Sequence, residues 1–308
     1  MYTLIGPPGS GVADVICALA RERKYTIHPA PPSNATLDDF EAETYDLRTV
    51  NESVEDILVI PHLERYFLRY HDGLALVRSL TERLTTRRRA LVGCDSWAWA
   101  FLQQAVGIGD LFGEPRTLAP FDAQRLDAWF RTSPDFEISK FRRSDSEEMI
   151  FAAHSGERRS EQEQSEATTV IRSLAAQARG NSGVALALWR SSLRKYEPKT
   201  DESVRGVQAA GNNYWVASSS ELTLPQVQGG VKQLHQFILH TLLLHAGLPL
   251  STLITLLPFA REEVCSCVSE LRLAGVIDEH NQILRVTLTA YPKVRQDLIG
   301  DGFLADAF

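Results

Sequence analysis

The chain has 308 residues, of which 44% are hydrophobic and 23% charged, and its formal net charge is −7 at pH 7. These values are typical of a globular chain with two or three domains. No apolar run approaches the ~20 residues that a membrane-spanning helix needs, so we expect no membrane insertion. The four cysteines are dispersed without metal-type pairing, which favours reduced thiols and a cytoplasmic location.

The first twenty residues combine a short apolar run, a glycine-rich turn and a helical pattern. The apolar run is Tyr2–Ile5, the turn is Gly6–Gly11, and the helical pattern covers Val12–Arg23. Strand, glycine loop and helix in this order form the phosphate-binding loop G-x-x-x-x-G-K-[ST], and Gly6 and Gly11 have the required spacing. The segment therefore predicts the backbone of a nucleotide site.

Two side chains that phosphoryl transfer needs are missing from this loop. Val12 stands in the place of the lysine that reaches the phosphates, and Ala13 in the place of the hydroxyl that holds magnesium. Backbone N–H groups at the start of a helix still attract anions, so binding of ATP or ADP without hydrolysis is the alternative to no cofactor at all. The nucleotide-loop candidates are Gly6, Gly9, Gly11, Val12 and Ala13.

Short apolar runs alternate with helical patterns as far as residue 121. The expected strands are Lys24–His28, Ile57–Ile60, Ala90–Cys94 and Thr117–Ala119, and the expected helices are Leu74–Leu84 and a segment that begins at Trp97. Four consecutive apolar residues at Ile57–Ile60 indicate a strand that is buried on both faces. Strands that alternate with helices predict an α/β domain with a parallel sheet.

The remainder of the chain divides into three further parts. Residues 122–196 are predicted to be helical throughout, as a lid domain, and residues 197–230 form a connector with one strand. Residues 231–308 contain three helical patterns, an alternating hairpin pattern and a last helix from Tyr291, which together predict a winged helix. The predicted domains are thus 1–121, 122–196, 197–230 and 231–308.

This order of parts resembles the AAA+ and STAND branch of P-loop ATPases, in which an α/β domain precedes a helical lid and often a winged helix. In that group the Walker B strand corresponds to Ile57–Ile60, and its two acidic residues would fall at Pro61 and His62. Glu64 is near but displaced, and we expect it to point elsewhere. Both Walker motifs are therefore degenerate.

The resemblance also implies positions for two further elements of the family. The sensor-1 position corresponds to Asp95 or Ser96, and Arg116 lies roughly where an arginine finger would sit. With the lysine, the hydroxyl and both acids absent, the resemblance implies no catalytic residue. We therefore expect a catalytically inactive AAA+/STAND-like ATPase that serves as a scaffold or regulatory subunit. The alternatives are a nucleotide-sensing switch without hydrolysis and a winged-helix DNA-binding regulator with a decayed ATPase domain.

The C-terminal module is acidic, and this favours a protein partner or self-association over nucleic acid. Residues 231–308 contain 6 Lys plus Arg and 8 Asp plus Glu, a net charge of −2, whereas DNA-binding domains present a basic face. The aromatic tail Gly302–Phe308 docks either on its own chain or on another subunit. No metal is expected, because His235, His240 and His245 recur every five residues and so spread around one helix.

Overall fold

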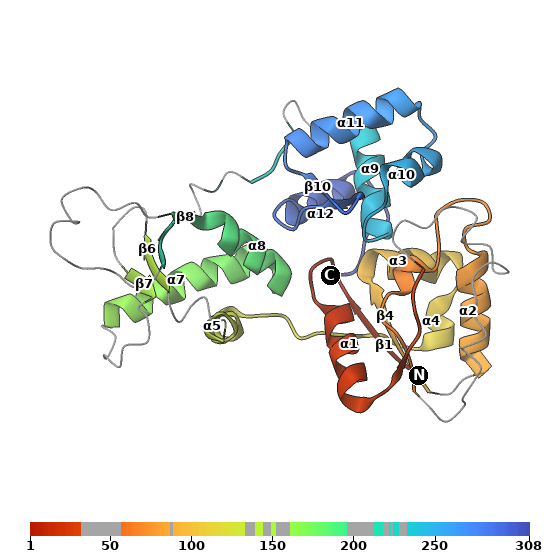
Figure 1. Cartoon of the computed structure of the whole chain (residues 1–308), viewed down its shortest axis with the longest axis horizontal. Helices are drawn as coiled ribbons and strands as arrows, with labels where there is room; N and C mark the ends of the chain where they lie inside the picture. Colours follow the sequence, from red (N-terminus) through yellow and green to blue (C-terminus); the bar gives the residue numbers. More distant parts are fainter. Residues whose placement is uncertain are drawn as a thin grey trace. The chain divides into compact units, whose positions relative to one another are not determined.

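The computed structural model describes residues 1–31, 57–86, 89–132, 139–143, 149–151, 161–195, 212–217, 222, 224–227 and 233–308 (Figure 1). Two compact units are present. The first combines Met1–Ala119 with Pro225–Phe308, and the second covers Pro120–Leu224. Among the helices of these described residues, none has both the length and the apolar character that a membrane span requires.

The first unit contains a parallel five-stranded sheet of the order β2-β3-β4-β1-β5. Its strands are β1 (Tyr2–Gly6), β2 (Thr26–Ile27), β3 (Leu58–Ile60), β4 (Ala90–Asp95) and β5 (Arg116–Thr117). All three residues of β3 are buried, as the unbroken apolar run predicted. The α/β class with a parallel sheet is therefore confirmed, and β4 lies between β1 and β3.

Helices cover both faces of this sheet. They are α1 (Val12–Arg23), α2 (Ala75–Thr86), α3 (Ser96–Ala105) and α4 (Ile108–Phe112), and a short 3-10 helix η3 (Leu63–Arg65) follows β3. Figure 1 shows α1 on one side of the sheet and α2 and α4 on the other. The apolar stripe of α1 supplies the contact, because Val12, Ile16 and Ala20 pack with Val59 of β3 in one core cluster.

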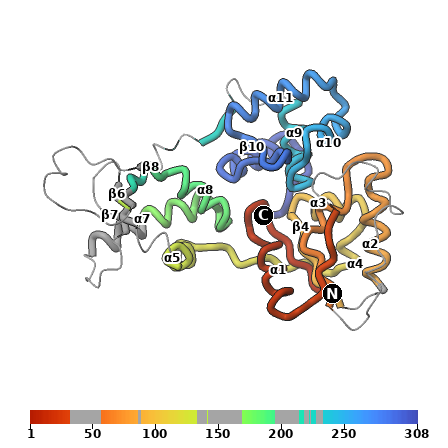
Figure 2. The backbone as a smooth tube through the Cα atoms, in the orientation of Figure 1, coloured from red at the N-terminus to blue at the C-terminus, as the bar shows by residue number. Residues whose placement is uncertain are grey.

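The same unit includes the C-terminal module, whose elements agree with the predicted ones. They are α9 (Gln233–Leu244), α10 (Leu250–Leu256), α11 (Arg261–Leu273), the antiparallel pair β10 (Ile277–His280) and β11 (Ile283–Val286), and α12 (Tyr291–Gly300). Helix α9 is apolar on most of its surface and contacts both α11 and α3 of the α/β domain. The tube view in Figure 2 shows α9 and the C-terminal end of the chain next to α3.

The second unit is not helical throughout, so that prediction was wrong. It contains α5 (Ala123–Arg131), α7 (Glu161–Ala178) and α8 (Ser182–Ser192), together with β6 (Ser139–Arg143), β7 (Met149–Phe151), β8 (Leu193–Lys195) and β9 (Asn212–Val216). The four strands form one sheet of the order β7-β6-β9-β8.

The reason for this error is that the pairing in the second sheet is not local. Strand β6 pairs in parallel with β9, which lies about seventy residues later, in the segment predicted as a connector. Strands of three to five residues have no periodicity long enough to distinguish them from helix ends. The proposed domain boundaries themselves stay predictions.

Candidate functional site

The glycine loop has the backbone conformation that its sequence predicts. Gly9 and Gly11 adopt positive φ angles of 82° and 79°, which only glycine adopts at little cost. The Ser10 N–H donates to the Pro7 carbonyl at 3.0 Å and closes the turn. A Cβ at Gly6 would lie 2.4 Å from Ser10 Oγ, so these glycines are needed by the loop itself.

Val12, at the lysine position, belongs to the hydrophobic core. Its exposed fraction is 7%, and it packs with Ile16, Ala20 and Val59. This position therefore contributes apolar packing and no positive charge. Ala13 follows it in the first turn of α1 and offers no hydroxyl.

A cleft of about 490 Å³ borders the loop, within the first unit. The loop residues Gly6, Gly9, Gly11, Val12 and Ala13 all line it, together with residues that follow β3 and β4 and residues of the C-terminal module. Four acidic side chains and two arginines line it, namely Asp14, Glu64, Asp95, Asp278, Arg65 and Arg285. No lysine is among the described residues that line the cleft, so a polyphosphate attracted by the backbone N–H groups would lack the lysine contact of a working loop.

Glu64 points into this arrangement, which corrects the expectation that it would point elsewhere. One carboxylate oxygen lies 2.8 Å from His62 Nδ1, and the other accepts a hydrogen bond from the Asp95 N–H at 3.2 Å. The 3-10 turn of η3 returns Glu64 to the edge of the sheet. Just before this turn, the backbone of Pro61 lies against Gly93 of β4, where a Cβ would be 2.5 Å from the Pro61 carbonyl oxygen.

Asp95 ends β4 and starts α3. Its carboxylate accepts a hydrogen bond from the Trp97 N–H at 2.9 Å as the N-cap of the helix. Burial raises the pKa of Asp95 well above its usual range, the Glu64 carboxylate raises it further, and the bond from Trp97 opposes the shift. Burial likewise raises the pKa of the Cys94 thiol. The carboxylates of Glu64 and Asp95 are therefore both engaged in hydrogen bonds within the chain.

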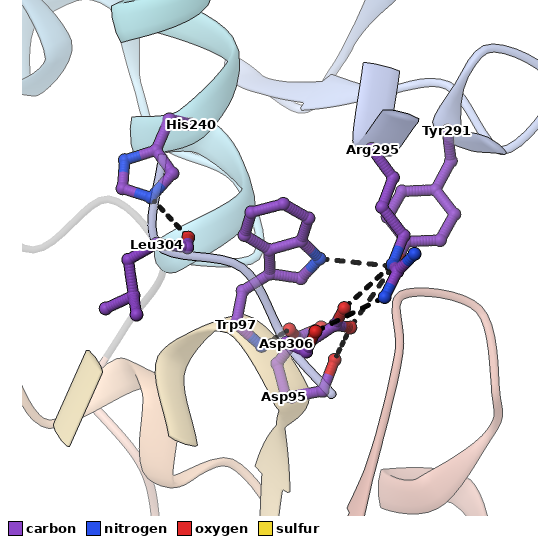
Figure 3. A network of polar contacts seen from close by, with 8 residues as sticks. Asp95, Trp97, His240, Tyr291, Arg295, Leu304 and Asp306 are labelled. Atoms are coloured by element: carbon purple, nitrogen blue, oxygen red, sulfur yellow. Dashed lines mark hydrogen bonds and ion pairs between the residues drawn. The ribbon is translucent and has the colours of Figure 1, made fainter. Parts of the chain in front are cut away.

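Next to Asp95, a buried polar network joins α3 to the C-terminal segment (Figure 3). Ser96 Oγ donates to Asp306 Oδ2 at 2.5 Å, and Arg295 Nε donates to Asp306 Oδ1 at 2.8 Å. Trp97 Nε1 donates to Tyr291 OH at 3.1 Å, and this hydroxyl lies 3.4 Å from Asp306 Oδ2. The Asp306 side chain is only 1% exposed, so the carboxylate is satisfied entirely by its own chain.

The aromatic tail thus docks on its own chain. Phe303 packs against Phe237 and His240 of α9, with ring centroids 5.5 and 5.1 Å apart. His240 Nε2 lies 3.0 Å from the Leu304 carbonyl oxygen, to which it donates. Phe308, by contrast, remains 41% exposed.

Two histidines of this region are buried in their neutral form. Burial lowers the pKa of His240 to about 4, an effect that its bond to Leu304 opposes. Burial lowers the pKa of His245 to about 3. The His245 ring packs against Phe67 at a tilt of 51°, with ring centroids 4.9 Å apart, and both of its ring nitrogens lack a hydrogen-bond partner among the described residues.

Arg116, the arginine-finger candidate, lies apart from the cleft. Arg116 lies on the edge strand β5, where it pairs with Leu4 of β1. Its guanidinium carbon lies 5.5 Å from the ring centroid of Tyr2. Tyr2 is at the start of β1, whereas the glycine loop follows the end of that strand. The sequence singled out Ser96 as a sensor-1 candidate but not its bond to Asp306, because the two residues are separated by 210 positions and no local pattern marks Asp306.

Comparison with known proteins gives similarity of architecture only. No family model matches the chain, and no curated protein matches it. The Orc1 protein of Aeropyrum pernix, in a structure with DNA, is 13% identical over 97% of this chain and 87% of that chain, with a TM-score of 0.36. Cdc6p from Pyrobaculum aerophilum is 12% identical over 99% and 88%, with a TM-score of 0.32.

The expectation that nucleic acid is not a partner has to be corrected. One of these two similar structures is a complex with DNA, which contradicts that expectation, and we withdraw it. The physical reason is that net charge averages over a whole module, whereas phosphate contacts depend on individual groups at the contact surface. At these identities and scores the similarity assigns no ligand to the present chain.

Proposed function

We propose that this protein is an AAA+/STAND-like ATPase homologue that performs no phosphoryl transfer and acts as a scaffold or regulatory subunit of a protein assembly. The observation that carries the proposal is the burial of Val12 in the core, at the position where the lysine of a working loop would reach the phosphates. The absence of acids at Pro61 and His62 supports the same conclusion, because magnesium then lacks its usual anchor.

The buried network supports the scaffold role. At the sensor-1 position, Asp95 caps α3 and Ser96 bonds to Asp306. Of these two side chains, Ser96 thus helps to hold the C-terminal module, with its proposed winged helix, on the α/β domain, whereas Asp95 is engaged in capping α3. On this proposal, we expect the relative placement of these two parts not to depend on a nucleotide.

Purification of the tagged full chain from its native host, with and without enzymatic removal of ATP, tests this role. We expect a stoichiometric protein partner that stays bound after ATP removal, identified by mass spectrometry and confirmed with purified components. A partner that dissociates when ATP is removed would contradict the proposal. A duplex-DNA titration at physiological salt on the same material determines whether the assembly also binds DNA.

A second candidate function is a switch that binds ATP or ADP without hydrolysis. The cleft of about 490 Å³ beside the glycine loop favours it, because the backbone of the phosphate cradle is retained there. Titration with a fluorescent ADP analogue distinguishes the two candidates. Saturable binding that Gly11→Trp abolishes would favour the switch, and no saturable binding favours the scaffold.

A further inference from the structure

Helices α9 and α11 bring together three side chains of the types that bind transition metals. His235 lies on α9, and Cys267 and Glu270 lie on α11. One ligand atom from each of the three lies within 4.8 Å of the others, and His235 Nε2 is 3.1 Å from Glu270 Oε2. We propose that His235, Cys267 and Glu270 bind one Zn²⁺ ion that joins the two helices.

Helical geometry explains this grouping. Cys267 and Glu270 are three residues apart, so they share one face of α11. On α9, His235 and His240 are five residues apart, about 140° around the axis. His240 contacts Leu304 and Phe303 of the tail, which leaves His235 to face α11. We expected no metal from the spacing of the histidines on one helix and from the dispersed cysteines, whereas the proposed site takes one ligand from α9 and two from α11.

The donor set fits zinc and disfavours the common hard cations. Imidazole nitrogen, thiolate sulfur and carboxylate oxygen are the usual protein ligands of zinc. Because zinc is commonly four-coordinate, three protein ligands leave a fourth position for water. Magnesium and calcium prefer all-oxygen sites, so the thiolate selects against them. On binding, the thiol proton is released to solvent.

The burial of the three ligands differs in a way that suits such a site. His235 is fully buried and Cys267 is 7% exposed, so both are held in place by the packing of the helices. The Glu270 side chain is 42% exposed and leaves a solvent-facing side through which the ion and the fourth ligand, water, can enter. An ion at this position links α9 and α11, so it should stabilise the module by binding only the folded state.

Metal binding is measured on the full chain after treatment with a chelator, using Zn²⁺ alone in a calorimetric titration and Co²⁺ as a spectroscopic probe. We expect one ion per chain and a sulfur-to-cobalt charge-transfer band. Cys267→Ser should remove that band and weaken zinc binding by at least about tenfold. The matched control is Cys265→Ser on the same helix, because Cys265 lies two residues away on another face, and it should bind as the unchanged chain does.

A second variant keeps the test decisive if Cys267→Ser fails to fold. Glu270→Gln alters a partly exposed side chain and should also lower the affinity, and the rise in Tm on zinc addition should shrink with it. Absence of stoichiometric binding in the unchanged chain would overturn the proposal. So would binding that Cys265→Ser abolishes, or binding that neither Cys267→Ser nor Glu270→Gln affects.

Discussion

The glycine loop and the junction between α3 and the C-terminal module follow the ends of neighbouring parallel strands, β1 and β4, yet they differ in their use of polar groups. At the loop, the position of the phosphate-binding lysine is Val12, which is buried in the core. At the junction, Ser96 and Asp306 are buried and bonded to each other. At this edge of the sheet, the buried side chain at the loop is apolar, whereas the buried polar side chains at the junction form hydrogen bonds within the chain.

This difference suggests how the protein uses its fold. Buried charge is tolerated when it is paired and hydrogen-bonded, and Asp306 has such partners in Arg295 and Ser96. The cleft beside the loop has more acids than arginines and no lysine among its lining residues. The stability of the junction can therefore be tested by mutation, whereas substitutions in the loop are expected to leave phosphate release at the background rate.

The largest expected effect comes from removing the central carboxylate of the junction. Asp306→Ala leaves Arg295, whose side chain is 14% exposed, without its ion-pair partner, and we expect a loss of about 3–5 kcal/mol in the free energy of unfolding. Urea denaturation measures this. The control is Asp297→Ala, which breaks the more exposed pair with Lys293 and should cost less than about 1 kcal/mol. Equal effects of the two changes would contradict the junction's central role.

Acidification should weaken the same junction through His240. The folded-state pKa of about 4 lies below the ordinary value of 6.5, so the unfolded chain binds more protons in between. Stability from this group is fully present above pH 6.5 and is lost as the pH falls toward 4, by about 3 kcal/mol. His245, with a pKa of about 3, extends the loss to lower pH. Urea midpoints between pH 7 and 4 measure it.

A variant at His245 sharpens that pH dependence. His245→Phe replaces a buried ring whose nitrogens lack hydrogen-bond partners among the described residues, so we expect no loss of stability at pH 7. The acid loss should become shallower between pH 6.5 and 4, where both histidines take up protons on unfolding, and the part of the loss below pH 4 should shrink. An unchanged pH profile would show that His245 does not titrate with unfolding.

A smaller effect is expected from the tyrosine of the network. Tyr291→Phe removes the hydroxyl that accepts from Trp97 Nε1 at 3.1 Å and leaves this buried donor unsatisfied, at a cost of about 1–3 kcal/mol. A double-mutant cycle with Trp97→Phe should give a coupling energy of at least about 0.5 kcal/mol. Simple additivity of the two single changes would show that this bond contributes no specific stability.

The smallest effect is expected at the loop. Val12→Lys combined with Ala13→Ser restores the loop motif but leaves Pro61 and His62 in place of the Walker B acids. We expect phosphate release to stay at the background rate, since no acid anchors magnesium. A large gain in turnover would show that Glu64 or Asp95, which line the cleft, supplies that function.

Local sequence patterns predicted the α/β sheet and the C-terminal helices, because the central strands β3 and β4 are largely buried apolar runs and most of the helices are long enough to have a clear period. The glycine loop was also predictable, since its residues are contiguous. The network of Ser96 and Asp306 was not, because pairing over 210 residues depends on tertiary packing. The position of Glu64 was missed for a related reason, since it depends on a single 3-10 turn after β3.

The most direct test of the account is phosphate release by the purified full chain with magnesium and ATP, alone and with its co-purified partner. We predict release indistinguishable from a protein-free control in both cases. Gly11→Trp is the loop-specific variant, because Gly11 lies in the phosphate cradle at a φ of 79°, which a tryptophan adopts only with strain confined to the loop, while no heavy atom lies within 4 Å of an added Cβ. Steady turnover that Gly11→Trp abolishes would contradict the account.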